Sequence, residues 1–202
     1  MNRYQSLDTF LQKIRSDIYP EPPSEPHLSI TVQLINQLVS SGIVVPGHRV
    51  LDVGCGSGLA LEAFARAGID AIGVTLGPEI QECREKGLDV REMDGSFLQF
   101  DDNTFHLIWC RHTLEHSFSP LFTLHGFYKK LQQGGRLYVE VPAPETSCRH
   151  ETNPNHYYVM GKPMWRSLFH KVGFHLEWGG DFPFDTPEGP DLYYGFLLRK
   201  SA

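Results

Sequence analysis

The chain has 202 residues, 41% of them hydrophobic, and a formal net charge of -6, which is the size and composition of one folded domain. No apolar run approaches the roughly 18 residues of a membrane span, and residues 1–20 lack the features of a signal peptide. We therefore expect a cytoplasmic protein that contacts no membrane. The negative charge, without a Lys/Arg cluster to offset it, argues against nucleic acid as a partner.

The amino-terminal region predicts an accessory unit ahead of the main domain. Residues 6–18 carry apolar side chains at helical spacing, so we expect a helix with one buried face. Residues 19–26 contain four prolines and predict an extended linker. Residues 1–26 are thus expected to form an accessory helix and linker, and residues 27–202 the main domain, which begins with a second helix over about 26–41.

The middle of the chain alternates short apolar runs with helix-like segments, a pattern typical of buried parallel strands. Ser119 is expected to cap a helix that runs to Gly134. A strand and helix repeat of this kind predicts a doubly wound α/β sheet. The expected strands cover residues 49–54, 70–76, 88–93, 105–110 and 135–141.

The carboxyl-terminal part departs from this rhythm. A polar stretch over residues 143–161 is too long for a routine connection and suggests a functional loop. A last helix over 162–174 and two closing strands, 175–182 and 192–199, follow, with an acidic loop between them. We expect a mostly parallel seven-stranded sheet with helices on both faces and an antiparallel last strand. The four separate cysteines, with no CxxC pair, are expected to be reduced thiols.

The segment 50–58, VLDVGCGSG, places three glycines at every second position where the first strand meets its helix. Glycines there allow positive φ angles and close approach of a ligand. The GxGxG spacing differs from the GxGxxG of dinucleotide sites, and Asp52 precedes it. An acid beside the turn suits a ligand with an ammonium group. Glycines that serve only tight packing, and a nicotinamide-dependent oxidoreductase, remain alternatives.

Five ordered segments between Val50 and Phe174 resemble class I S-adenosylmethionine-dependent methyltransferases of the small bacterial type. They are VLDVGCGSG, MDGSFLQFDDNTFHLI, LEH, LQQGGRLYVEVP and NPNHYYVMGKPMWRSLFHKVGF. The resemblance implies a Rossmann-like methyltransferase fold and S-adenosyl-L-methionine as the cofactor.

The resemblance also implies roles for single residues. The three glycines would line the methionine and ribose, Asp52 would lie near the ammonium group, and Asp94 would accept from the adenine amino group. Thr75 stands where the family usually has an acid for the ribose hydroxyls, so Glu79 is a second candidate for that task. The expected cofactor contacts are Asp52, Gly54, Cys55, Gly56, Gly58, Thr75, Leu76, Asp94, Gly95, Ser96 and Arg111.

Methyl transfer to a hydroxyl is helped by a base, and the segment after the fourth strand offers His112 and His116 as catalytic candidates. The same segment reads HxxEH, a zinc pattern that needs one continuous helix. Because a new helix starts soon after it, we expect no metal. The expected substrate contacts are His112, His156, Tyr157 and Tyr158.

The sequence thus predicts an enzyme that moves a methyl group from S-adenosylmethionine to a small metabolite or glycan, most simply at oxygen. An oxidoreductase and a catalytically silent cofactor-binding module are the alternatives. The oligomeric state stays open.

Overall fold

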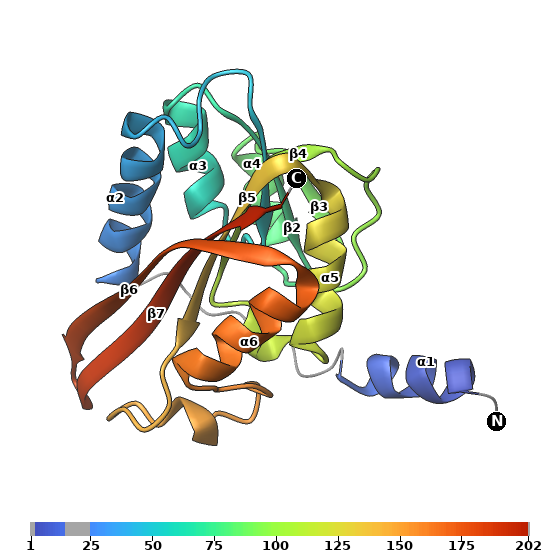
Figure 1. Ribbon diagram of the computed structural model, residues 1–202, viewed down its shortest axis with the longest axis vertical. Helices are drawn as coiled ribbons and strands as arrows, with labels where there is room; N and C mark the ends of the chain where they lie inside the picture. Colours follow the sequence, from blue (N-terminus) through green and yellow to red (C-terminus); the bar gives the residue numbers. More distant parts are fainter. Residues whose placement is uncertain (1–2, 15–24, 202) are drawn as a thin grey trace.

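The computed structural model describes residues 3–14 and 25–201 and shows a seven-stranded sheet between two layers of helices (Figure 1). The strand order is β3-β2-β1-β4-β5-β7-β6. The strands are β1 (Arg49–Val53), β2 (Asp70–Thr75), β3 (Val90–Glu92), β4 (Phe105–Arg111), β5 (Leu131–Pro142), β6 (Phe174–Thr186) and β7 (Gly189–Lys200). The helices are α1 (Arg3–Ile14), α2 (His27–Ser40), α3 (Leu59–Arg66), α4 (Ile80–Glu85), α5 (Pro120–Lys130) and α6 (Lys162–Val172).

The pairing of the strands confirms the predicted fold class. Strands β1 to β5 are parallel to one another, whereas β7 runs antiparallel to both β5 and β6. The carboxyl ends of the first five strands therefore meet at one edge of the sheet. The loops at that edge hold most of the polar residues singled out above.

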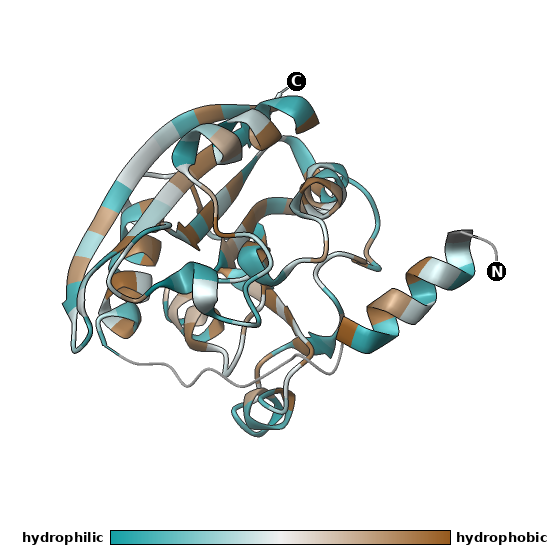
Figure 2. Ribbon diagram, turned by 90° about the horizontal axis from the view of Figure 1, so that it is seen from below, coloured by the Kyte–Doolittle hydropathy of each residue, from teal (hydrophilic) through white to brown (hydrophobic). Residues whose placement is uncertain are grey.

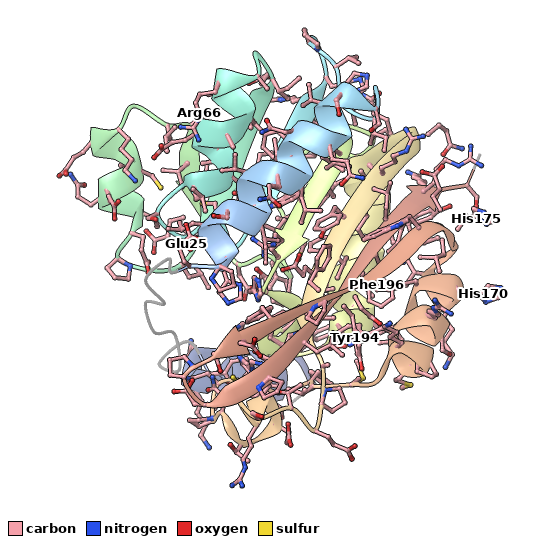
Figure 3. The ribbon with its side chains drawn as sticks, turned by 90° about the vertical axis from the view of Figure 1, so that its left-hand side faces the viewer. Glu25, Arg66, His170, His175, Tyr194 and Phe196 are labelled. Atoms are coloured by element: carbon pink, nitrogen blue, oxygen red, sulfur yellow. The ribbon has the colours of Figure 1, made fainter. Side chains whose placement is uncertain are left out.

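Alternate side chains of the central strands pack on opposite faces of the sheet, as the period of two in a strand requires. On β4, Ile108 belongs to the core under α5 and α6, and Trp109 to the core under α2 and α3. Both faces are thus covered, which explains why the central strands read as continuous apolar runs. Polar side chains such as Arg66 on α3 and His170 on α6 lie on the outer surface (Figure 3).

Two predicted boundaries are wrong. The helix capped by Ser119 ends at Lys130 rather than Gly134, because Leu131 already pairs with Phe105 of β4. The acidic segment 183–191 is not a loop, since it forms the end of a β6–β7 hairpin that turns between Thr186 and Gly189. Prolines at a sheet edge made this segment look irregular in the sequence.

The amino-terminal helix forms, but its expected buried face does not. Leu7 and Phe10 are 38% and 47% exposed, and most of α1 extends away from the sheet in two views (Figures 1 and 2). Only its last residue, Ile14, reaches the cavity described below. An amphipathic pattern shows that a helix has an apolar stripe and does not show what covers it. The predicted linker, up to residue 24, lies outside the described residues.

Within residues 3–14 and 25–201, no helix has both the length and the apolar character needed to cross a bilayer.

Candidate active site

A cavity of about 430 Å³ opens at the carboxyl ends of the central strands, where open α/β sheets bind their ligands. It gathers most of the residues that the sequence singled out. Three of them, Gly58, His156 and Tyr158, are not in its wall. The predicted residues that line it are Asp52, Gly54, Cys55, Gly56, Thr75, Leu76, Asp94, Gly95, Ser96, Arg111, His112, His116 and Tyr157.

The three glycines after β1 serve different purposes. A Cβ atom on Gly54 would lie 2.1 Å from Thr113 Oγ1, and one on Gly58 would lie 2.4 Å from Leu88 Cδ1. These two positions are closed by the protein itself. Gly56 has a φ of +48° and a Cβ there would meet nothing within 4 Å. Of the three, only Gly56 leaves open space at the cavity wall that a ligand can use.

Asp52 is a buried carboxyl group at this cavity, only 3% exposed. Burial, with a smaller contribution from the nearby Cys83, raises the pKa of Asp52 to about 8. A buried carboxylate is costly without a positive partner. The site is therefore suited to a ligand that brings a cation to Asp52.

Asp94 follows β3 and is fixed by the turn that it starts. Its Oδ1 accepts a hydrogen bond from the Ser96 backbone N–H at 2.8 Å. A Cβ on the intervening Gly95 would lie 2.5 Å from Val53 Cγ1, so this turn packs closely on the end of β1. The arrangement presents a carboxylate, held by a local turn, to the cavity.

Glu79 supplies a carboxylate near the end of β2, where the strand itself ends in the neutral Thr75. A Cβ on Gly77 would lie 1.9 Å from Glu79 Oε2, so the Glu79 side chain folds back over the backbone of Gly77. All three residues line the cavity. The glycine makes room for the acid.

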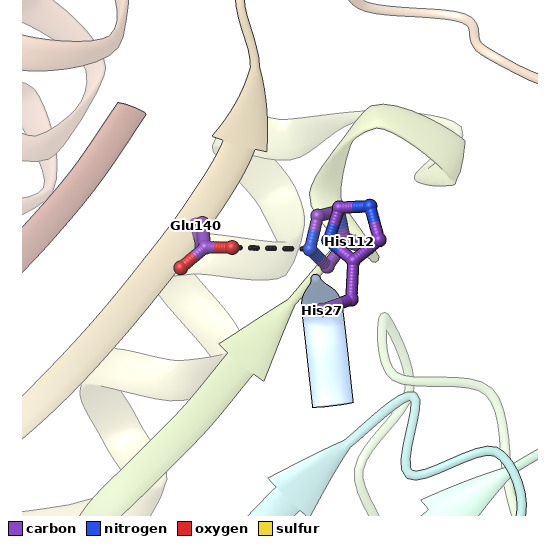
Figure 4. A group of neighbouring side chains, drawn as sticks. All are labelled: His27, His112 and Glu140. Carbon is purple, nitrogen blue, oxygen red and sulfur yellow. Dashed lines mark ion pairs between the residues drawn. The ribbon is translucent and has the colours of Figure 1, made fainter. Parts of the chain in front are cut away.

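His112 and Glu140 form a pair at the ends of β4 and β5 (Figure 4). His112 Nε2 lies 3.1 Å from Glu140 Oε1. Glu140 also accepts a hydrogen bond from Tyr138 Oη at 2.9 Å and pairs with Arg111. His112 has a φ of +50°, an uncommon conformation for a residue with a side chain, which is found at functional sites.

The charge states of this group follow from its surroundings. Burial lowers the pKa of His112 to about 4, although Glu140 acts in the opposite direction. Burial would raise the pKa of Glu140, but the charges of Arg111 and His112 outweigh it and bring the pKa to about 2. Near pH 7, Glu140 is an anion and His112 is neutral. The Glu140 carboxylate near Nε2 favours a proton on that nitrogen, which leaves the lone pair on Nδ1.

Arg111 lines the cavity, but its guanidinium is committed to the protein. It donates to Glu140, to Thr31 Oγ1 and to the His27 backbone oxygen. These contacts fasten the start of α2 to the sheet. The geometry thus gives Arg111 a positioning task, and its contact with the cofactor stays a prediction.

Sequence reasoning missed His27, Glu140 and Tyr193. The His27 and Tyr193 rings lie 4.9 Å and 4.4 Å from the His112 ring, although they belong to α2 and β7. Only Glu140 left a signal in the sequence, as a lone acid inside the apolar run LYVEV. Such an acid in a buried strand needs a partner.

The long loop folds over the residues that follow β4. The backbone N–H groups of Tyr157 and Tyr158 donate to the Glu115 carbonyl at 2.7 and 3.1 Å. His116 Nδ1 lies 2.8 Å from the Asn155 carbonyl. The loop is thereby brought to the cavity, where Asn155 and Tyr157 form part of the wall.

Residues 51–139 match the family model described as a methyltransferase domain. This region contains the glycine turn, Asp94 and His112. The chain contains a class I S-adenosylmethionine-dependent methyltransferase domain.

Two relatives carry the name ubiquinone biosynthesis O-methyltransferase. The protein from Xylella fastidiosa is 34% identical over 146 residues, which cover 68% of this chain and 58% of the relative. The protein from Methylococcus capsulatus is 30% identical over 110 residues, which cover 50% of this chain and 46% of the relative. The chain thus spans about half the length of the curated relatives that it matches.

Solved structures share the fold of this methyltransferase domain. An S-adenosylmethionine-dependent methyltransferase from Archaeoglobus fulgidus superposes with a TM-score of 0.67 and 20% identity over 84% of this chain and 94% of its own. The [4+2]-cyclase SpnF has a TM-score of 0.71 and 20% identity over 91% of this chain and 86% of its own. Because a cyclase shares it, the fold alone does not decide the reaction.

The residues present fit S-adenosylmethionine, the cofactor that this domain implies. Asp52 is a buried acid suited to the ammonium group, Gly56 leaves open space at the wall, and Asp94 presents a fixed acceptor. A pyrophosphate would instead place negative charge beside these carboxyl groups, so the site disfavours a dinucleotide.

Proposed function

We propose that this protein transfers a methyl group from S-adenosylmethionine to a hydroxyl oxygen of a small molecule, with His112 as the base. The observation that carries the proposal is the His112–Glu140 pair, in which a neutral imidazole of the cavity wall is backed by a buried anion. The names of the two relatives support oxygen as the acceptor atom. Both small metabolites and glycans remain within this class.

The cavity has two parts in this proposal, one for the cofactor and one for the acceptor, and the turns after β1, β2 and β3 form the part for the cofactor. We assign Asp52 to the ammonium group, Asp94 to the adenine amino group and Glu79 to the ribose hydroxyls. Gly56 lets the cofactor approach the backbone. When bound, S-adenosylmethionine supplies a methyl group that is already activated by the sulfonium charge.

His112 removes the proton of the acceptor hydroxyl. Its Nδ1 carries the lone pair, and the proton that arrives there turns the ring into an imidazolium. Glu140, 3.1 Å from Nε2, stabilises that positive charge and keeps the ring in orientation, much as a carboxylate does for other histidine bases. Arg111 and Tyr138 hold Glu140 in place.

The His27 and Tyr193 rings confine the acceptor beside His112. Both pack edge-on against its ring and both line the cavity. They exclude water from the base and offer apolar surface to a small ring or chain. Positioning and desolvation supply much of the rate in a transfer from an activated donor.

The test is acceptor-dependent formation of S-adenosylhomocysteine by the purified full chain. A panel of phenols, enols, simple sugars and amines is offered, and the products are identified by mass spectrometry. We expect turnover with a hydroxyl compound and an O-methyl product. Exclusive methylation of amines would contradict the oxygen assignment. Tight S-adenosylhomocysteine binding without turnover on any acceptor would favour a silent binding module.

A further inference from the structure

Five of the ten histidines of this chain gather with acidic side chains, namely His27, His112, His116, His150 and His156. Three groups of His, Cys, Asp and Glu side chains bring one ligand atom each within 4.8 Å of the others, among the described residues. They are His27 with His112 and Glu140, then Cys148 with His150 and Asp191, and lastly Glu115 with His116 and His156.

The first two groups have local partners that account for them. In the first, the Arg111 guanidinium already supplies the positive charge beside Glu140. In the second, His150 Nε2 lies 3.0 Å from both oxygens of Asp191, and Cys148 Sγ lies 3.3 Å from Thr186 Oγ1. The second group is therefore an acid–imidazole pair with a hydroxyl-bonded thiol beside it.

The third group has the outer contacts that orient metal ligands. His116 Nδ1 lies 2.8 Å from the Asn155 carbonyl, and His156 Nδ1 lies 3.0 Å from the His150 carbonyl. A carbonyl only accepts, so each Nδ1 carries a proton, and in the neutral ring each Nε2 carries the lone pair. His156 Nε2 also lies 3.4 Å from Asn153 Nδ2, a long contact that an ion at Nε2 would replace. An imidazole tied through one nitrogen to a backbone carbonyl is the usual form of a metal-binding histidine.

The chain holds these ligands on two segments that are themselves fastened together. Glu115 and His116 belong to the short turn after β4, and His156 belongs to the long loop. The Tyr157 N–H bond to the Glu115 carbonyl, at 2.7 Å, joins the two segments directly beside the ligands. The His116 and His156 ring centroids are 4.7 Å apart at 73°.

We propose that Glu115, His116 and His156 bind a divalent transition-metal ion of the zinc type at the acceptor side of the cavity. Two imidazoles and one carboxylate suit such an ion and leave coordination positions open. His116 lines the cavity, so an open position is accessible to an oxygen-bearing acceptor. Ligand atoms around a tetrahedral zinc ion are about 3.4 Å apart, so the three atoms, which lie within 4.8 Å of one another, would draw closer when an ion binds.

This proposal departs from our expectation of no metal, and it differs from the HxxEH pattern, which needs one continuous helix. His112 belongs to the first group, and its place is taken by His156, which lies forty residues further along the chain than His116. The metal would polarise an acceptor hydroxyl that His112 deprotonates, so its purpose rests on the proposed function. Binding of the ion itself does not depend on the proposed function.

The experiment is calorimetric titration of the metal-stripped full chain with Zn²⁺, with visible spectroscopy of the Co²⁺ form. We expect one ion per chain, a spectrum without a thiolate charge-transfer band, and loss of affinity by about 100-fold in His116→Gln and in His156→Gln. Loss of an outer partner alone costs about 10- to 100-fold. His125→Gln, at an exposed histidine of α5, is the matched control and should bind as the parent chain does.

Absence of stoichiometric binding would overturn the inference, as would unchanged binding in both variants. So would loss of binding in Cys148→Ser together with a thiolate band, because that result places the ion in the second group. Melting temperatures of the variants show whether they fold. Zinc binding without methylation of any acceptor refutes the proposed function alone, whereas methylation by a chain that binds no zinc refutes this inference alone.

Discussion

The two halves of the cavity are built from very different lengths of chain. The half that we assign to the cofactor, called the cofactor half, comes from the turns after β1, β2 and β3, within residues 52–96. The acceptor half joins His27, His112, Glu140 and Tyr193, from α2, β4, β5 and β7. A short motif can specify the first half, because each residue needs only its own turn. The second half exists only when the sheet is complete.

The halves also differ in charge. The cofactor half presents Asp52, Asp94 and Glu79, which suit a cationic ligand rich in donors. The acceptor half is a neutral imidazole backed by an ion pair between Glu140 and Arg111. We infer that the first half selects by charge and that the second keeps a base dry and uncharged.

The largest expected effect is loss of catalysis without loss of cofactor binding, in His112→Asn. Removing the base should lower kcat by about 100- to 10,000-fold, while the Kd for S-adenosylhomocysteine stays within about twofold. Steady-state kinetics and calorimetry measure the two quantities. His125→Asn, at the exposed position on α5, should match the parent chain. A parallel loss of cofactor affinity would show that the two halves are not separable.

The reverse effect is expected for Gly56→Ala. The new methyl group enters space that the cofactor uses. Overpacking of a closely fitted site costs about 1 to 3 kcal/mol, so affinity for S-adenosylhomocysteine should fall by about 5- to 150-fold. Gly68→Ala is the control, because Gly68 also has a positive φ, of +72°, and open space around its Cβ. Both variants should lose about 1 kcal/mol of stability. Equal affinities in the two would refute the role of Gly56.

Cofactor binding should depend on pH through Asp52. The pKa of this group is raised to about 8 in the chain, and an ammonium ligand favours the deprotonated form. Binding therefore releases a proton below about pH 8, and affinity should rise with pH by up to about tenfold per unit until it levels off near pH 8. Calorimetry in buffers of different ionisation enthalpy counts the protons. Asp52→Asn should bind weakly and without this dependence.

Glu79→Gln should give the smallest change. The loss of one charged acceptor for a ribose hydroxyl is worth about 1 kcal/mol, or roughly fivefold in Kd. Glu85→Gln, at an exposed acid of α4, should have no effect. A cofactor analogue that lacks a ribose hydroxyl provides the sharper measurement. If Glu79 holds that hydroxyl, the losses in binding free energy from the substitution and from the analogue should not add. Strict additivity would contradict the role of Glu79 and favour Thr75 as the residue that binds the ribose.

The sequence by itself determined the layers, the seven strands and the turns after β1, β2 and β3 that line the cavity, because apolar periodicity and glycine turns act over a few residues. It also placed His112 at the edge that binds ligands. It misplaced the end of the Ser119 helix, where the pairing of Leu131 with Phe105 overrides helical propensity. The acidic segment 183–191 was wrongly predicted to be a loop, because its prolines are typical of irregular segments although the segment pairs within the β6–β7 hairpin.

Only the tertiary structure decided what surrounds His112. Glu140, His27 and Tyr193 reach it from three other elements. Burial lowers the pKa of the imidazole, and the Glu140 carboxylate acts against that shift. The same holds for His116, which meets His156 only because the long loop bonds back to Glu115. A sequence pattern records neighbours along the chain, whereas desolvation and charge depend on neighbours in space. Those neighbours are set by the spatial order of the strands in the sheet.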